Sequence, residues 1–146
     1  MQRITHVGVL VTSIDKALPL WVDQYGFQLI KRIKVLQEGV HSAFLALNGH
    51  PEEFMVELVE PMNPDDIENT VSRRLREHGE GLLHLAIVAD DMVKVHERLR
   101  ASQATFADRE AVTAGCEPRV MVSPKANNGT LVEVLSAPDW QGVWSD

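Results

Sequence analysis

The chain contains an internal repeat, and this feature constrains its fold most. Each half opens with a histidine in an apolar run and closes with a glutamate in another apolar run. His84 follows His6 by 78 residues, and Glu133 follows Glu57 by 76, so the two halves repeat almost in register. The four runs are Ile4–Val11, Phe54–Val59, Leu82–Ala89 and Thr130–Leu135. A sequence that repeats in this way predicts two copies of one structural unit packed against each other.

The repeated histidines and glutamates predict a metal site. A single histidine in an apolar strand is more often a core residue, and a single strand glutamate more often faces solvent. Solvent-facing residues have no reason to recur at matching positions in both halves, whereas ligands that converge between the halves do. A buried carboxylate also needs a cation or a hydrogen-bond partner. We therefore expect one divalent ion (Co, Ni, Zn, Mn or Mg) held by His6, Glu57, His84 and Glu133.

Hydrophobic periodicity predicts a repeated β-α-β-β-β plan in one α+β domain, residues 1–146. The first module spans about residues 4–61 and the second about residues 82–136. A helix over residues 14–25, capped by Ser13 and kinked or shortened at Pro19, follows the first strand. A connecting helix over about residues 63–79, capped by Asn63, joins the modules. The tail, residues 137–146, is an apolar flap carrying Trp140 and Trp144, for which intramolecular cover and a dimer contact remain open.

Composition restricts the class of protein. The chain has 146 residues and a formal net charge of −7, which argues against nucleic acid as the main partner. Its apolar runs are too short to span a membrane. The single cysteine excludes an internal disulfide and favours a reducing cytoplasm, and the N-terminus leads directly into a strand, so we expect no signal peptide.

Four stretches resemble the vicinal oxygen chelate superfamily, which includes glyoxalases, bleomycin resistance proteins and extradiol dioxygenases, and within it the methylmalonyl-CoA epimerases most. They are Thr5–Val9, Val56–Pro61, Gly79–Ile87 and Ser123–Val134. The resemblance implies a glyoxalase-like fold, in which paired βαβββ modules form a partly open barrel around the metal. It also implies the four ligands named above, a homodimer and a substrate such as an acyl-CoA or a similar oxygen-chelating metabolite.

The chain departs from the epimerase pattern at three places. Ser123 stands where these enzymes usually have a histidine, and the loop Ala114–Pro118 lacks their usual glycine-rich, basic character. Ser42 occupies a strand position at which some members have a glutamate. These departures affect the identity of the substrate more than the class of reaction.

The expected activity is that of a metal-dependent isomerase that epimerises a methylmalonyl-CoA-like thioester by abstracting the proton at C2. Glu133 is the expected base on one face of the substrate. Glu57, His41 and a water held by Ser42 remain open for the other face. We expect substrate contacts from Arg119 and Lys125, which flank loops at the site, and from Ser42 and Ser123.

Other functions remain open for such a chain. A lyase of the glyoxalase I type, acting on lactoylglutathione, is the main alternative. A non-haem iron dioxygenase usually has two histidines and one glutamate as ligands, so a fourth ligand weighs against it. A non-catalytic protein that sequesters a small molecule needs no metal. The presence of all four metal-binding side chains weighs against this function.

Overall fold

The computed structural model describes residues 2–110 and 117–145, and its first module follows the expected β-α-β-β-β order. The elements are β1 (Arg3–Leu10), α1 (Ile14–Tyr25), β2 (Gln28–Val35), the 3₁₀ turn η1 (Leu36–Glu38), β3 (Val40–Ala46) and β4 (Met55–Pro61). The Ser13 side chain caps α1, and Gly26, with a φ of 78°, ends it. Pro19 lies inside α1 without ending the helix.

The second module repeats this order after a connecting helix. The connecting helix is α2 (Thr70–His78). The elements of the module are β5 (Gly81–Ala89), α3 (Met92–Ala101), β6 (Phe106–Arg109), β7 (Arg119–Val122), the 3₁₀ turn η2 (Pro124–Ala126) and β8 (Leu131–Ser136), and the tail helix α4 (Ala137–Trp144) follows them. None of the helices in the described part of the chain is long and apolar enough to cross a membrane.

The strands form one mixed sheet in the order β2-β3-β4-β1-β5-β8-β7-β6. β1 and β5 are antiparallel and join the modules at the centre, while β4 lies parallel to β1 and β8 lies parallel to β5. Glu57 lies beside Gly8, and Glu133 lies beside Ala86, so each glutamate sits opposite the residue two positions after its module's histidine. The α+β glyoxalase-like fold expected from the sequence is therefore confirmed, and the repeat is visible in the strand register.

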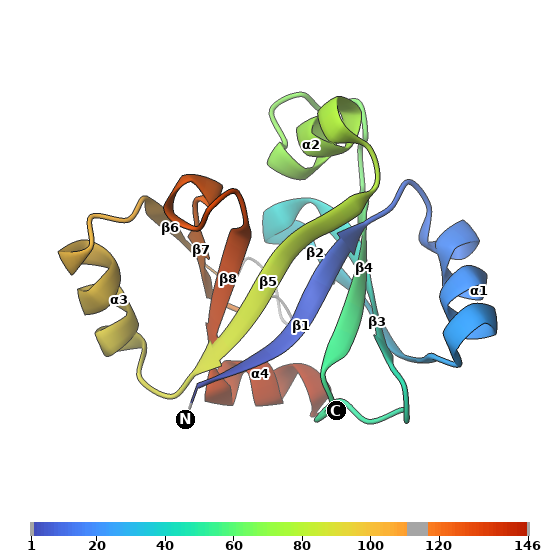
Figure 1. Ribbon diagram of the computed structural model, residues 1–146, viewed down its shortest axis with the longest axis horizontal. Coiled ribbons are helices and arrows are strands. Elements are labelled where there is room, and N and C mark those ends of the chain that lie inside the picture. The colour runs from blue at the N-terminus through green and yellow to red at the C-terminus, as the bar shows by residue number, and fades with distance from the viewer. Residues whose placement is uncertain (1, 111–116, 146) are drawn as a thin grey trace.

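The helices cover different parts of the sheet. In Figure 1, α1 and α3 lie at its two sides, while α2 and α4 lie at opposite ends of the strands. The core beneath α1 includes Ile14 and Leu58, and α3 packs on a separate core that includes Val120 and Val134. Two further apolar clusters accompany α2 and α4: Leu10, Val35, Val40, Val59, Val71 and Leu83 in the first, and Phe44, Ala46, Met55, Val88, Leu135 and Trp140 in the second.

The connecting helix is shorter than the sequence predicts. It begins at Thr70, capped by Asn69, and not at Asn63. The Asn63 side chain accepts a hydrogen bond from the Asp65 amide, and the Asp66 side chain accepts one from the Glu68 amide. Such local side-chain bonds offer the backbone an alternative to helix, which explains the turns before Asn69.

The C-terminal tail forms a regular helix that covers the sheet. Ser136 caps α4 by accepting a hydrogen bond from the Asp139 amide, and Trp140 is buried. Of the two roles that the sequence left open for Trp140, the structure shows intramolecular cover.

Candidate metal centre

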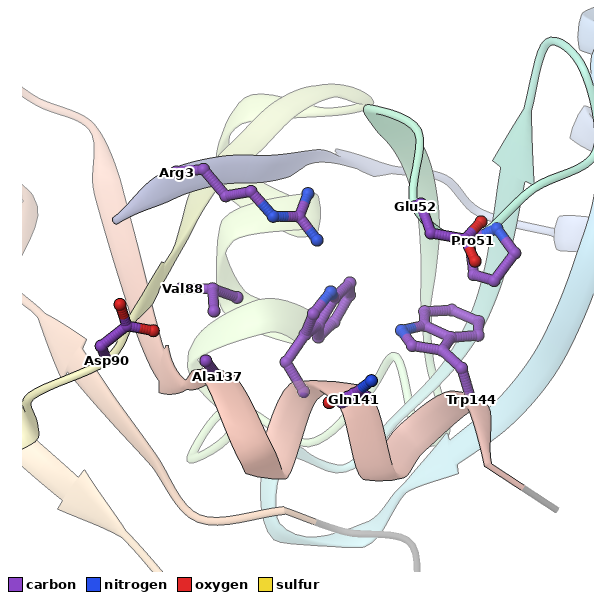
Figure 2. A pocket seen from close by; sticks show the side chains of 9 residues that line it. Arg3, Pro51, Glu52, Val88, Asp90, Ala137, Gln141 and Trp144 are labelled. Carbon is purple, nitrogen blue, oxygen red and sulfur yellow. The ribbon is translucent and has the colours of Figure 1, made fainter. Parts of the chain in front are cut away.

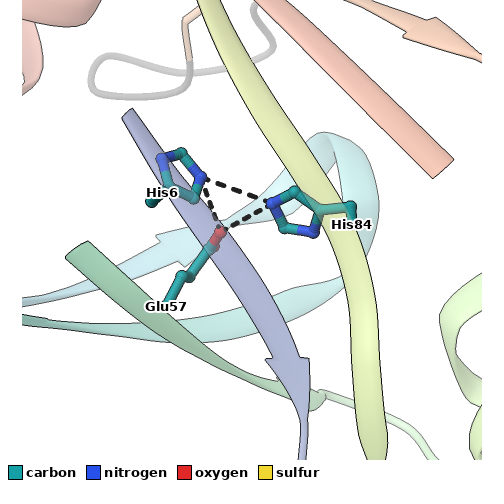
Figure 3. A group of neighbouring side chains, drawn as sticks. All are labelled: His6, Glu57 and His84. Carbon is teal, nitrogen blue, oxygen red and sulfur yellow. Dashed lines mark hydrogen bonds and ion pairs between the residues drawn. The ribbon is translucent and has the colours of Figure 1, made fainter. Parts of the chain in front are cut away.

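Three of the four predicted ligands converge between the two modules. His6 comes from β1, Glu57 from β4 and His84 from β5, and all three side chains are buried. Glu57 Oε1 lies 3.1 Å from Nε2 of His6 and 3.1 Å from Nε2 of His84, and the two Nε2 atoms are 3.3 Å apart. Figure 3 shows the three side chains pointing toward one common position. We call these residues the triad.

The spacing and chemistry of the triad fit a divalent ion. Ligand atoms that lie about 2.1 Å from one ion, at angles of roughly 90–110°, are about 3.0–3.4 Å apart. The three measured separations fall in this range. A carboxylate oxygen and two imidazole nitrogens that face one another also need a positive charge among them, from a proton or a metal. Imidazole and carboxylate ligands suit Zn, Co, Ni or Mn, and the ligand set does not select among them.

Gly8 makes room for His84 in the sheet. The two residues are opposite each other in the antiparallel ladder of β1 and β5. A Cβ atom at residue 8 would lie 2.3 Å from both Cε1 and Nδ1 of the His84 ring, closer than any real contact. Because glycine has no side chain, the ring can lie across β1 and turn Nε2 toward Glu57.

His6 is held by a polar partner on one side and by aromatic rings on the other. Its Nδ1 lies 3.0 Å from the Thr5 hydroxyl, which in turn donates to the Ala86 carbonyl oxygen. With a proton on Nδ1, this arrangement leaves Nε2 free to bind a metal. The ring stacks on Trp140 at a centroid distance of 5.0 Å and meets the edge of Phe44 at 5.1 Å.

The Glu57 carboxylate divides its two oxygens between separate tasks. Oε1 faces both histidines, while Oε2 accepts a 2.6 Å hydrogen bond from the Ser42 hydroxyl. Burial would raise the pKa of Glu57, but hydrogen bonds from His6 and His84 outweigh it and hold that pKa well below its ordinary value. For His84, burial acts to lower the pKa. The hydrogen bond and the charge of Glu57 outweigh burial, so the pKa of His84 is raised. Ser42 thus orients Glu57, and its contact with substrate stays a prediction.

Glu133, the fourth predicted ligand, is buried but pairs with an arginine. Its Oε2 lies 3.2 Å from a terminal nitrogen of Arg119, whose side chain is 11% exposed. Glu133 lies outside the group that the three triad residues form. Its roles as ligand and as base therefore stay predictions. Arg119 pairs with Glu133 and lines the cavity beside the triad, and its contact with substrate stays a prediction.

A cavity of about 80 Å³ lies against the triad, on the side of the apolar cluster that accompanies α2. Its polar lining consists of Glu38, Glu57, Thr70, His84, Arg109, Arg119 and Glu133. Lys125 and Ser123 do not line it. Lys125 is exposed, and Ser123 caps η2 by accepting a hydrogen bond from the Lys125 amide. Their contacts with substrate stay predictions. Residues 114–116 of the loop Ala114–Pro118 lie outside the described residues.

Two charged residues of this cavity were missed in the sequence. Glu38 in η1 and Arg109 at the end of β6 form an ion pair, with 3.3 Å between Arg109 Nε and Glu38 Oε1. Burial raises the pKa of Glu38, against the opposing charges of Arg109 and Arg119. Glu38 precedes a glycine in a turn, a context typical of solvent-exposed residues, so no local pattern indicates its burial.

A larger cavity of about 310 Å³ lies on the other side of Trp140. Figure 2 shows Arg3 and Trp144 at its lining, with α4 along one side. Because Trp140 lines this cavity and also stacks on His6, its ring separates the cavity from the triad.

The fold and the triad define a class of protein: a duplicated βαβββ sheet with a buried His/Glu/His group between its modules. The sequence profile of the glyoxalase/bleomycin resistance protein/dioxygenase superfamily matches residues 5–120. The chain belongs to this superfamily.

Individual relatives are more distant. The chain is 27% identical to YqjC of Bacillus subtilis, over 92% of this chain and 91% of that protein. It is 24% identical to mouse mitochondrial methylmalonyl-CoA epimerase, over 92% of this chain and 73% of the mouse protein. It is 22% identical to a rice lactoylglutathione lyase, over 92% of this chain and 43% of the rice protein. Among solved structures, Streptomyces coelicolor methylmalonyl-CoA epimerase in complex with 2-nitronate-propionyl-CoA superposes with a TM-score of 0.77 at 22% identity, covering 92% of this chain and 96% of that one. At this identity the structural match establishes the fold.

Proposed function

We propose that the protein is a metal-dependent isomerase that epimerises a methylmalonyl-CoA-like acyl thioester by moving the proton at C2. The observation that carries the proposal is the triad, with ligand atoms 3.1–3.3 Å apart, at a small cavity that also holds two further carboxylates. The similarity to epimerases, one of them bound to an acyl-CoA analogue, supports this choice of substrate class.

The residues of the cavity account for the steps of such a reaction. A divalent ion at the triad supplies stabilisation of the negative charge that develops on neighbouring substrate oxygens when C2 loses its proton. Arg119 is positioned to bind the free carboxylate of the substrate, once that carboxylate takes the place of Glu133 beside it. Glu133, released from this pair, is then available to exchange a proton with C2. The apolar wall that includes Val40 and Leu83 keeps water from the reacting carbon.

Solvent exchange tests this proposal. One epimer of methylmalonyl-CoA is incubated in D₂O with metal-free or Co²⁺-reconstituted protein, and a sample without protein gives the spontaneous rate. Reconstituted protein is expected to introduce deuterium at C2 and to form the other epimer, both by NMR, and metal-free protein to do neither above the spontaneous rate. Reconstituted protein without exchange would contradict the proposal.

A lyase of the glyoxalase I type is the second candidate, and the similarity to lactoylglutathione lyase favours it. This reaction also begins with removal of a proton beside an oxygen pair, so the same residues would serve it. Conversion of the methylglyoxal–glutathione hemithioacetal, together with no exchange into methylmalonyl-CoA, would assign the protein to this branch.

We further propose a homodimer, which the family resemblance favours. Trp140 is buried on the inner face of α4, which removes that residue from any dimer contact. Light scattering at micromolar concentration tests the proposal, and a monomer of about 16 kDa with full activity would contradict it.

A further inference from the structure

We propose that Glu38 is the second proton-transfer residue of this site, acting on the face of the substrate opposite to Glu133. This inference rests on the proposed isomerase function and names a residue that it still lacks. Inverting a carbon centre requires removal of a proton from one face and its return to the other, and one carboxylate cannot readily reach both faces.

The groups that the sequence left open for the second face of the substrate have other contacts or point away from the cavity. Glu57 shares its oxygens between the two histidines and Ser42, whose hydroxyl is used in that bond. His41 is the neighbour of Ser42 in β3, so strand alternation turns its side chain to the other face of the sheet. Among the described residues that line the cavity, two carboxylates remain outside the triad, Glu38 and Glu133.

These two carboxylates approach the cavity from opposite halves of the sheet. Glu38 belongs to the turn between β2 and β3 in the first module, whereas Glu133 lies on β8 in the second. The central strands β1 and β5 lie between the two halves in the sheet order, while the ion pair of Glu38 with Arg109 joins the β2–β3 turn to the second module. Both carboxylates line the cavity beside the triad, one from each module, and the proposal places the bound substrate between them, as proton transfer on two faces requires.

The backbone around Glu38 fixes its position. The Asn69 side chain, which caps α2, donates a 2.9 Å hydrogen bond to the Glu38 carbonyl oxygen. Gly39 follows with a φ of 66°, and a Cβ atom there would lie 2.7 Å from Asn69 Nδ2, so the turn and the start of α2 are closely packed. Glu38 is thus held against the cavity by contacts that do not involve its carboxylate.

The surroundings of the Glu38 carboxylate suit proton exchange. Its side chain is 18% exposed, and Oε1 has Arg109 Nε at 3.3 Å but accepts no well-aligned hydrogen bond from the described residues. Burial raises its pKa, while Arg109 and Arg119 oppose that rise. A carboxyl group whose pKa is raised by burial holds a proton more readily than an exposed one, and its remaining exposure lets it exchange that proton with solvent.

The proton balance of the step is simple. The C2–H bond breaks, its electron pair stays on the substrate as an enolate, and the proton passes to the carboxylate of Glu133. Glu38, protonated beforehand, gives its proton to C2 from the other face and becomes a carboxylate. The opposite epimer reacts in reverse, and exchange with solvent restores the starting protonation states.

The test compares Glu38→Gln with wild type in D₂O, starting from each epimer separately, with Co²⁺ content measured in every sample. Glu38→Gln is expected to lose epimerisation by about 10²–10⁴-fold. It should still exchange the C2 proton of the epimer whose C–H bond faces Glu133, and should lose exchange from the other epimer. Glu133→Gln should give the opposite preference. Glu52→Gln, at the cavity beyond Trp140, is the matched control and should behave as wild type.

Three results would overturn the assignment of Glu38. Wild-type rates from both epimers in metal-loaded Glu38→Gln would show that Glu38 transfers no proton, while leaving the proposed function intact. Equal loss from both epimers would assign Glu38 to substrate binding or to the stability of the turn. Absence of exchange in the wild type would reject the proposed function itself, and the role of Glu38 with it.

Discussion

Gly8 lies directly opposite His84 in the central β1–β5 ladder, and the His84 ring occupies the space where a side chain at residue 8 would begin. The absence of a single carbon atom in β1 thus sets the orientation of a candidate ligand in β5. This dependence leads to a sharp test of the site.

Gly8→Ala is expected to displace His84 and to lower metal affinity, because its Cβ would lie 2.3 Å from two ring atoms. Overpacking of this kind also costs about 1–3 kcal/mol of stability. Gly142→Ala is the control, since a methyl group added to that helical glycine would have nothing within 4 Å of it. It should keep full metal affinity and gain about 0.5–1 kcal/mol in urea unfolding. Equal metal affinity in both variants would refute the positioning role of Gly8.

Ser42→Ala should weaken metal binding by about 10–100-fold, the range seen when a group that orients a ligand is lost. The hydroxyl donates a 2.6 Å hydrogen bond to Glu57, and without it the carboxylate can rotate away from the histidines. Ser72→Ala is a matched control, because this buried serine donates to the Asn63 carbonyl oxygen outside the cavity lining. Isothermal titration should show a weaker Zn²⁺ affinity for Ser42→Ala than for Ser72→Ala. Similar affinities of the two variants would count against the role of Ser42.

Trp140→Ala should destabilise the fold by about 3–5 kcal/mol, as is usual for removal of a buried tryptophan. It should also weaken metal binding, since His6 loses the ring on which it stacks. Trp144→Ala removes a half-buried ring that contacts Phe44 and Trp140. The second variant should lose less stability and keep its metal affinity. An unchanged metal affinity in Trp140→Ala would show that α4 does not support the site.

The pair formed by His96 and Asp108 predicts a pH dependence of stability away from the site. The hydrogen bond from His96 Nε2 to Asp108, 2.7 Å long, is the main reason that the pKa of His96 is raised. A raised folded-state pKa means that the pair stabilises the protein below the unfolded-state pKa of about 6.5 and that this contribution is lost as pH rises through the folded-state value. Asp108→Asn should therefore cost about 0.5 kcal/mol near pH 5.5 and almost nothing near pH 8.5. A cost that grew with pH in urea unfolding would contradict the assignment.

Much of the fold and the convergence of the triad could be predicted from the sequence, because both follow from the repeat. His6, Glu57 and His84 lie on strands whose apolar pattern is plain, and matching positions in two copies of one unit meet where the units pack. The strand order and register then bring the three ligand atoms together without any contribution from loops.

The rest depends on contacts between distant segments. Glu38 is half-buried where the β2–β3 turn meets the end of β6, which lies in the other module, and no local pattern carries that information. Glu133 shares the pattern of Glu57, yet its partner in the structure is Arg119 from the neighbouring strand. The sequence misplaces the start of α2 because Asn63 and Asn69 are both good capping residues, and hydrogen bonds in the turns between them decide which one is used.

Metal content tests the central claim most directly. Protein purified without chelators, or reconstituted and desalted, is measured by elemental analysis beside His84→Ala and the control His41→Ala. Wild type and the control should carry about one divalent ion per chain. His84→Ala should carry little, because His6 and Glu57 alone hold an ion too weakly to retain it. Full metal content in His84→Ala, or a wild type that retains no divalent ion after reconstitution, would contradict the account.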